Sequence, residues 1–267
     1  MSGLTPPVVI LARPQLGENI GAAARAMKNC GLTDLRLVAP RDGWPNPAAL
    51  PLAAAGKDII ESAEVYKTLG DALHDVTFLV ATSARPRDMA KSVLDPRTAA
   101  PLLVRHHEEV KDAGSYAGLL FGAERSGLDN DELALADVIV QADLNPEATS
   151  LNLSQAVFLM AWEWRVAALQ HSAARQVISK GAGLRKTAYP KIPADTAIIP
   201  ATGAARDFFF TRLETILDKR QFFGSPEMAP VVKRNLRTYF TRGTPTEQEL
   251  NTLHGILTLF EQGKGLG

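Results

Sequence analysis

The first 170 residues contain short, unbroken runs of apolar residues separated by segments of helical composition. A strand whose apolar residues do not alternate with polar ones is buried on both faces, as in a parallel sheet covered by helices. The alternation of such strands with helices predicts an α/β fold with a mostly parallel sheet and helices on both faces. The predicted strands cover residues 8–12, 35–38, 77–81, 117–121 and 138–140, and the predicted helices cover residues 19–30, closed by Gly31, and 151–169.

Beyond about residue 170 the sequence pattern changes. Residues 171–203 contain repeated Pro and Gly, which interrupt regular elements and indicate a linker. Residues 204–267 show three amphipathic helical stripes, and the third opens with a capping sequence that runs from Thr244 to Glu247. We therefore expect a domain over residues 1–170, a linker over 171–203 and a small all-helical C-terminal domain over 204–267.

The formal net charge of the chain is zero, but its charges are unevenly distributed. Residues 1–170 carry 15 basic and 21 acidic side chains, whereas residues 171–267 carry 14 basic and 8 acidic ones. A basic tail on an acidic body indicates either a polyanionic partner or a solvated face. The single cysteine, Cys30, excludes an intramolecular disulfide and fits a reducing compartment. With neither a secretory signal nor a membrane-spanning run, we expect a cytoplasmic protein.

A small-residue segment from Asn19 to Arg25 follows the first predicted strand. Gly21 and the alanines after it allow close approach of other groups, and a helix N-terminus favours anions. The glycine spacing, Gly17-x-x-x-Gly21, departs from the dinucleotide-binding fingerprint, so a nicotinamide oxidoreductase is not favoured. A helix that packs tightly on a sheet, with Arg25 in solvent, explains this segment equally well.

Two further polar segments follow strands in the same domain. Gly122-Ala123-Glu124-Arg125-Ser126-Gly127 forms a tight loop after a strand, where ligands of open α/β sheets usually bind. Ser150 and Asn152 stand at the entrance of the long apolar helix. The structural alternatives are a surface ion pair between Glu124 and Arg125, and simple helix caps at Ser150 and Asn152.

The remaining polar candidates give weaker signals. Thr82-Ser83-Ala84-Arg85 ends the third predicted strand and reads equally well as a polar loop. The five histidines show no spacing typical of zinc ligands, so we expect no metal site. The run from His106 to Glu109 is expected to be a solvated helix face.

Taken in this order and spacing, the segments at Asn19–Arg25, Leu120–Leu128 and Ser150–Ala156 resemble the three motifs of the SpoU/TrmH group of SPOUT RNA 2′-O-ribose methyltransferases. The Thr-Ser-Ala-Arg string and the C-terminal helices resemble TrmJ-type members of this group. The resemblance implies methylation of a ribose 2′-hydroxyl in tRNA at nucleotide 32 of the anticodon loop. It also implies a trefoil knot in the C-terminal part of the α/β domain, and a homodimer whose two subunits share the substrate site.

The resemblance also assigns roles to individual residues. The implied S-adenosylmethionine ligands are Thr82, Ser83, Ala84, Gly122, Glu124, Ala142, Thr149, Ser150 and Leu151. The implied catalytic set is Asn19, Arg25, Glu124, Ser150 and Asn152. The expected RNA ligands are Arg25, Arg85 and Arg125 in the body and Lys233, Arg234 and Arg237 in the basic tail.

Three questions stay open at the level of sequence. An rRNA methyltransferase of the same group differs mainly in its appended domain, and the helical tail favours tRNA. A non-catalytic RNA-binding protein on this fold is expected to lack Arg25 or the Ser150–Asn152 loop, and both are present. Because guanidinium stays protonated in proteins, Arg25 is better suited to hold a phosphate and stabilise alkoxide charge than to act as a base.

Overall fold

The computed structural model describes residues 4–85, 91–110, 116–179, 200–243 and 245–262. Its sheet is parallel throughout and has the strand order β3-β2-β1-β6-β4-β7-β5. This confirms the predicted α/β fold with a parallel sheet. The strands are β1 (Val8–Ala12), β2 (Leu35–Val38), β3 (Glu64–Tyr66), β4 (Val76–Thr82), β5 (Val93–Leu94), β6 (Tyr116–Phe121) and β7 (Val138–Val140).

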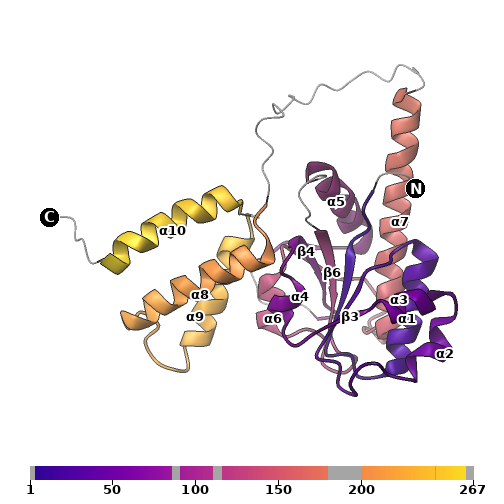
Figure 1. Cartoon of the computed structure of the whole chain (residues 1–267), viewed down its shortest axis with the longest axis horizontal. Coiled ribbons are helices and arrows are strands. Elements are labelled where there is room, and N and C mark those ends of the chain that lie inside the picture. The colour runs from indigo at the N-terminus through magenta and orange to yellow at the C-terminus, as the bar shows by residue number, and fades with distance from the viewer. Residues whose placement is uncertain (1–3, 86–90, 111–115, 180–199, 244, 263–267) are drawn as a thin grey trace.

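Alternate residues of the central strand β1 belong to two separate hydrophobic layers. Val9 and Leu11 pack with α1 (Gly17–Cys30), α5 (Pro96–Glu109) and α7 (Leu153–Ser179), whereas Val8 and Ile10 pack with α4 (Leu69–Ala72) and α6 (Asn130–Leu135). Because both faces of the strand are covered, its sequence is apolar without interruption. The short elements α2 (Ala49–Ala53), η1 (Ala54–Gly56) and α3 (Lys57–Glu61) lie beside α1 (Figure 1).

Helix α1 packs so closely on its neighbours that two glycines are required. A Cβ atom on Gly21 would lie 2.0 Å from the carbonyl oxygen of Ala49, and one on Gly56 would lie 2.6 Å from the carbonyl oxygen of Ala24. Gly31 ends the helix with a φ of 82°, in the left-handed region that favours glycine. Gly21 therefore serves helix packing, which is the structural alternative that the sequence left open for this segment.

The C-terminal helices α8 (Gly203–Lys219), α9 (Ala229–Thr241) and α10 (Glu247–Gln262) form an appendage with its own small core. Phe209 and Phe210 of α8 are buried there against Leu250 and Leu257 of α10. Thr246, rather than the predicted Thr244, caps α10: its hydroxyl accepts a hydrogen bond from the amide of Glu249, whose carboxylate accepts from Thr246 in return. Thr244 itself lies outside the described residues.

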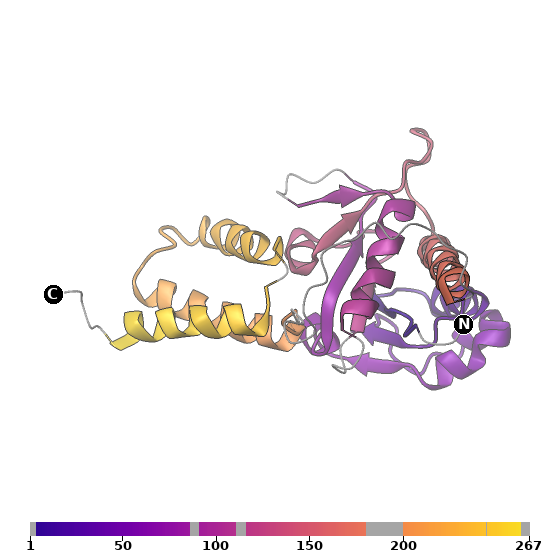
Figure 2. The same ribbon diagram turned by 90° about the horizontal axis from the view of Figure 1, so that it is seen from above.

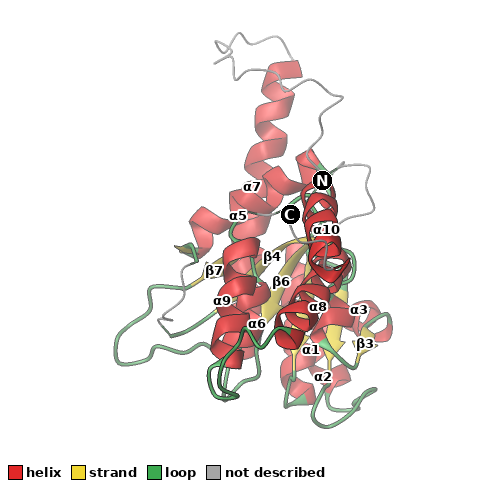
Figure 3. Ribbon diagram, turned by 90° about the vertical axis from the view of Figure 1, so that its left-hand side faces the viewer, coloured by secondary structure: helices red, strands yellow, loops and turns green. Residues whose placement is uncertain are grey.

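Buried polar contacts fix this appendage to the α/β domain. Arg206 of α8 donates to the Asp137 carboxylate at 2.9 Å, and both side chains are almost completely buried. The ammonium group of Lys91 donates to the carbonyl oxygens of Ala134 and Ala136 and to the hydroxyl of Thr241 in α9. Burial lowers the pKa of Lys91 to about 8. Figures 2 and 3 show α8 and α9 against one side of the sheet, with α7 on the opposite side.

The structure differs from the sequence-based expectations in several places. Helix α7 continues to Ser179, past residue 171 where the linker was expected to begin, and residues 180–199 of that expected linker lie outside the described part. The short edge strands β3 and β5 were missed because three and two residues are too few to show a period. His106, expected in solvent, is 5% exposed and hydrogen-bonds Thr77.

Candidate active site and cofactor pocket

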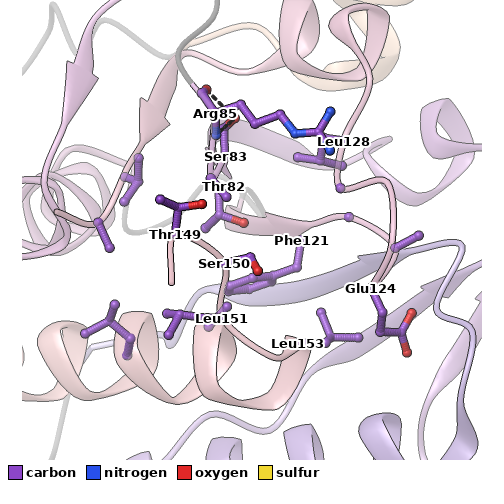
Figure 4. Close-up of a pocket in the computed structure, with 18 of the residues that line it drawn as sticks. Thr82, Ser83, Arg85, Phe121, Glu124, Leu128, Thr149, Ser150, Leu151 and Leu153 are labelled. Atoms are coloured by element: carbon purple, nitrogen blue, oxygen red, sulfur yellow. Dashed lines mark hydrogen bonds between the residues drawn. The ribbon is translucent and has the colours of Figure 1, made fainter. Parts of the chain in front are cut away.

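A pocket opens where β4, β6 and β7 end, at the carboxyl edge of the parallel sheet. This edge is where open α/β sheets bind ligands, because the loops leaving neighbouring strands converge there. Figure 4 shows Thr82 and Ser83 facing the segment from Thr149 to Leu151 across the pocket. All the residues assigned to the cofactor line this one pocket: Thr82, Ser83, Ala84, Gly122, Glu124, Ala142, Thr149, Ser150 and Leu151.

The pocket combines polar loop groups with an apolar wall. The wall is made by residues that the sequence analysis did not assign to the site: Phe121, Leu128, Val140, Leu144, Leu153 and Met160. Loop residues line most of the rest, some with hydroxyl groups and three with charges, Arg85, Glu124 and Arg125. Apolar surface suits the faces of an aromatic base, and a few polar groups fix the orientation of a ligand. The donor set therefore fits a nucleoside-containing cofactor such as S-adenosylmethionine.

Backbone contacts hold the loops around the pocket in place. The amide of Ser83 donates to the carbonyl oxygen of Val140, which ties the loop after β4 to the end of β7. The loop after β6 closes on itself, since a Cβ atom on Gly122 would lie 2.2 Å from the backbone of Gly127. Gly127 has a φ of 66°, which also favours glycine. Both glycines of this segment are thus needed for the loop to form.

Hydrogen bonds between side chains join the three sequence motifs. The carboxylate of Glu124 accepts from the side-chain amide of Asn19 at 2.9 Å and from the backbone amides of Gln15 and Leu16. The side-chain oxygen of Asn19 in turn accepts a hydrogen bond from the side-chain amide of Asn152 at 2.9 Å. Three members of the predicted catalytic set therefore form one hydrogen-bonded chain, Glu124–Asn19–Asn152.

Asn152 also caps helix α7. Its side-chain oxygen accepts from the amide and the hydroxyl of Ser154, and its own backbone amide donates to the side chain of Gln155. Asn152 is therefore a helix cap, as the structural alternative predicted. Because its side-chain oxygen is engaged in the cap, its side-chain NH2 group points toward Asn19. Ser150, two residues earlier, is exposed and lines the pocket.

The predicted RNA ligands of the α/β domain are exposed but occupy two different places. Arg85 and Arg125 line the pocket, on the loops after β4 and β6. Arg25 is exposed on α1, a helix that begins beside the pocket. It is not one of the residues that line the pocket. Of the predicted catalytic set, Glu124 and Ser150 line the pocket, and Asn19 and Asn152 are joined to Glu124 by hydrogen bonds. Arg25 belongs neither to the lining nor to that hydrogen-bonded chain.

The predicted RNA ligands of the tail are engaged within the protein. Arg237 donates to Glu214 at 2.8 Å, and Lys233 lies 3.7 Å from the same carboxylate. Arg234 of α9 donates to Asp131 of α6 at 2.7 Å. These pairs stabilise the appendage and its contact with the α/β domain, a role that helical stripes and charge counts could not indicate.

Arg13, a residue that the sequence analysis did not single out, stands directly after β1. Its guanidinium group donates to both carboxylate oxygens of Glu132 and lies 3.8 Å from Asp129. The hydrogen bond to Glu132 raises the pKa of Arg13 above its ordinary value. The sequence signal that could have identified Arg13 is its position directly after a predicted strand and shortly before the Asn19 motif.

Two kinds of feature are absent from the described residues. No cluster of three His, Cys, Asp or Glu side chains there could hold a metal ion. None of the helices in that part of the chain is long and apolar enough to span a membrane.

Comparison with known proteins identifies relatives that all belong to one group of RNA methyltransferases. The sequence profile described as the SpoU rRNA Methylase family matches residues 6–162. The tRNA (cytidine/uridine-2′-O-)-methyltransferase TrmJ of Yersinia enterocolitica is 35% identical over 95% of this chain and 91% of its own length. The protein of the same name from Salmonella typhimurium is 37% identical over 95% of this chain and 96% of its own length.

Solved structures agree with these matches. The crystal structure of TrmJ from Z. mobilis ZM4 is 39% identical, covers 96% of this chain and 99% of its own, and superposes with a TM-score of 0.78. A probable methylase family protein from Haemophilus influenzae Rd KW20 is 29% identical, covers 95% and 94% of the two chains, and has a TM-score of 0.58. Both similarities extend beyond the α/β domain into the helical appendage.

Proposed function

Because this chain belongs to the SpoU methylase family, we propose that it methylates a ribose 2′-hydroxyl of tRNA at nucleotide 32 of the anticodon loop. It is a methyltransferase of the tRNA (cytidine/uridine-2′-O-) type and uses S-adenosylmethionine. The convergence of the assigned cofactor residues on one pocket is the observation that supports the site. Nucleotide 32 rests on the resemblance of the motifs and of the tail to TrmJ-type enzymes.

The loops at the pocket would hold the cofactor, which supplies an activated methyl group bound to sulfonium. The protein then has two tasks, to align an RNA oxygen with that methyl group and to manage the charge that develops on the oxygen. Asn19 and Asn152 are held in fixed orientations by the chain that starts at Glu124. We propose that this chain orders the mouth of the pocket, next to the exposed Ser150.

Arg25 is proposed to bind the phosphate beside the target ribose. Its side chain is exposed on α1, in solvent where an RNA backbone can reach it. A guanidinium group stays protonated, so its role is to hold an anion and to stabilise negative charge on the ribose oxygen. Arg85 and Arg125, on the pocket rim, are the proposed further phosphate ligands.

We propose that the active form is a homodimer with substrate sites shared between subunits. Phe158 and Trp162 stack on the outer face of α7 and are 46% and 49% exposed, although aromatic side chains of this size are usually buried in monomers. Helix α7 lies on the opposite side of the sheet from the appendage (Figure 2), so the appendage does not obstruct a second copy that packs on α7. The trefoil knot remains a prediction from the resemblance, and the cytoplasmic location remains a prediction from the sequence composition.

The appendage, residues 204–267, is proposed to add affinity for tRNA. Lys233, Arg234 and Arg237 would reach phosphate groups only by sharing or exchanging their carboxylate partners. Phosphate contacts release counterions, so binding should weaken steeply with salt. Filter binding across a salt series, with all three changed to Gln, should give a shallower slope. An unchanged slope would assign these residues to structure alone.

Methylation of defined RNAs tests the proposed function directly. Purified protein, labelled S-adenosylmethionine and unmodified tRNA transcripts should yield one ribose methylation, which is lost when nucleotide 32 carries a 2′-deoxyribose. Methylation at another tRNA position would correct the target. Incorporation into rRNA fragments but not into tRNA would favour the rRNA methyltransferase alternative, which the family description also allows.

A further inference from the structure

A single turn at the start of α6 joins the loop after β1 to the appendage. Asp129 caps α6 by accepting hydrogen bonds from the amides of Asp131 and Glu132, and Glu132 accepts from the amide of Asp129 in return. Arg13 binds this turn from the side of β1, and Arg234 binds Asp131 from the side of α9. The turn is therefore fixed from two sides by ion pairs.

Arg13 adopts a backbone conformation that is unusual for its residue type. Its φ is 51°, in the left-handed region that costs energy for residues other than glycine. Its amide donates to the carbonyl oxygen of Val38, at the end of β2, and the chain then turns out of the sheet. Glu132, which receives both ends of the Arg13 guanidinium group, has a side chain only 9% exposed. The Arg13 side chain is itself 43% exposed, so this half-buried ion pair holds a strained residue in place.

The segment that Arg13 begins contains the donors that fix Glu124. The amides of Gln15 and Leu16 donate to the two carboxylate oxygens of Glu124, at 2.8 and 3.1 Å. Glu124 then orients the side chain of Asn19, and Asn19 in turn orients the side chain of Asn152. Any movement of the turn after β1 would shift these amides together with the hydrogen-bonded chain at the pocket.

We propose that Arg13, through its ion pair with Glu132, is a positioning residue for methyl transfer. It fixes the turn whose amides hold Glu124, and thereby sets Asn19 and Asn152 at the mouth of the pocket. Arg13 does not line the pocket itself. Its loss should therefore lower the rate of methyl transfer and leave cofactor affinity nearly intact. This inference rests on the proposed methyltransferase function.

The test compares Arg13→Met with wild type in the full-length protein. Met keeps an unbranched chain at the same backbone position but removes the charge and the hydrogen bonds. We expect kcat for tRNA methylation to fall about tenfold or more, since small misplacements of an active site carry costs of that order. The dissociation constant for S-adenosylhomocysteine, measured by calorimetry, should change less than about twofold, because Arg13 is not among the residues that line the pocket.

Two further variants separate positioning from simple stability. Arg13→Lys keeps the cation but loses the paired geometry, so it should restore part of kcat. Glu132→Gln should lower kcat in the same direction as Arg13→Met, because it removes the partner charge. If Arg13→Met does not fold, these two variants carry the test. The matched control is Arg105→Met, which removes an exposed arginine of α5 from its pair with Glu109.

Each outcome decides one question. A fall in kcat with unchanged S-adenosylhomocysteine affinity, partly restored by Lys, supports positioning. If Arg13→Met only lowers the melting temperature and keeps kcat, or loses cofactor affinity in proportion to kcat, the proposal is wrong. Wild-type protein that transfers no methyl group to tRNA would instead refute the proposed function, independently of Arg13.

Discussion

At the scale of single residues, the candidate site depends on side chains that have structural and functional contacts at once. Glu124 receives three hydrogen bonds from the segment that precedes and opens α1, so its carboxylate organises that segment. Asn152 caps α7 and also donates to Asn19. Substitutions at such positions must be chosen so that one contact is removed and the other kept.

Asn152→Asp should separate capping from the contact with Asn19. Aspartate caps helices as well as asparagine does, so the free energy of unfolding should change by less than about 1 kcal/mol. A carboxylate cannot donate to the oxygen of Asn19, so kcat should fall about tenfold or more. Asn152→Ala is the control, since it loses both contacts and should cost about 1 kcal/mol in stability as well. Full activity in the Asp variant would show that the contact with Asn19 is dispensable.

Arg25→Ala should abolish most methyl transfer and preserve cofactor binding. The side chain is exposed on α1 and is absent from the pocket lining, so S-adenosylhomocysteine should bind with wild-type affinity in calorimetry. Loss of a charge-assisted phosphate contact removes about 1.5–3 kcal/mol of transition-state stabilisation, so kcat/KM for tRNA should fall roughly 10- to 150-fold. Turnover near the wild-type rate would remove Arg25 from the proposed mechanism.

At the scale of elements, two helices on the same face of the sheet, α5 and α7, make contacts of different kinds. Helix α5 packs on β4 through apolar residues and through His106, which stacks on Phe78 at 5.2 Å and hydrogen-bonds Thr77. Helix α7 packs on α1 and α5 with one face and exposes large aromatic residues on another. These contacts lead to separate predictions for pH and for assembly.

Stability should fall as pH decreases from about 6.5 to about 4. Burial lowers the pKa of His106 from 6.5 to about 4, so the folded protein holds this imidazole neutral while the unfolded chain takes up a proton. The stabilisation is complete above pH 6.5 and is lost as pH falls through this window, by up to about 3 kcal/mol. Urea unfolding at several pH values measures it. His106→Gln cannot titrate, so a variant with the same pH dependence as wild type would contradict the assignment.

Trp162→Glu should convert the proposed dimer to monomer. Trp162 and Phe158 lie one helical turn apart on the exposed face of α7, and a buried charge at such a contact is costly. Light scattering after size-exclusion chromatography measures the mass. Leu259→Glu, on the exposed side of α10, is the control and should remain dimeric. A monomeric wild-type protein, or a Trp162→Glu dimer, would exclude this face as the interface.

At the scale of the whole molecule, the appendage is a docked part of one structure. The pairs Arg206–Asp137 and Lys91–Thr241 are buried between it and the α/β domain, and Arg234–Asp131 lies at the edge of the same contact. A surface for tRNA that includes both parts would therefore have a fixed geometry. Such a geometry fits recognition of a folded RNA by shape and by its exposed loop nucleotides.

Arg206→Met should destabilise the protein more than any substitution of a surface arginine. It leaves the carboxylate of Asp137 buried with one backbone donor, the amide of Leu79, and breaking a buried pair in this way costs about 3–5 kcal/mol. The double variant Arg206→Met/Asp137→Asn removes the charge and should recover part of the loss. Urea unfolding followed by circular dichroism measures both. A loss below about 1 kcal/mol in Arg206→Met would mean that the appendage docks without this pair.

The sequence alone determined the class of fold and indicated the loop residues of the pocket, but not its apolar wall. Unbroken apolar strands can only be buried on both faces, and loops after parallel strands must meet at one edge of the sheet, so the positions of Thr82, Gly122 and Thr149 followed from local pattern and from resemblance. Glycines at Gly31 and Gly122 were informative because backbone sterics act locally.

Only the tertiary structure decided which charges pair across the molecule. The partners in the pairs Arg13–Glu132, Arg206–Asp137 and Arg234–Asp131 are 119, 69 and 103 residues apart in the chain, and no sequence periodicity indicates such partners. The basic tail illustrates the consequence, since a count of charges cannot distinguish an arginine held by a carboxylate from one available to RNA. Pairing depends on the distance between side chains in the folded chain, and the packing of α6 between the sheet and α9 sets that distance.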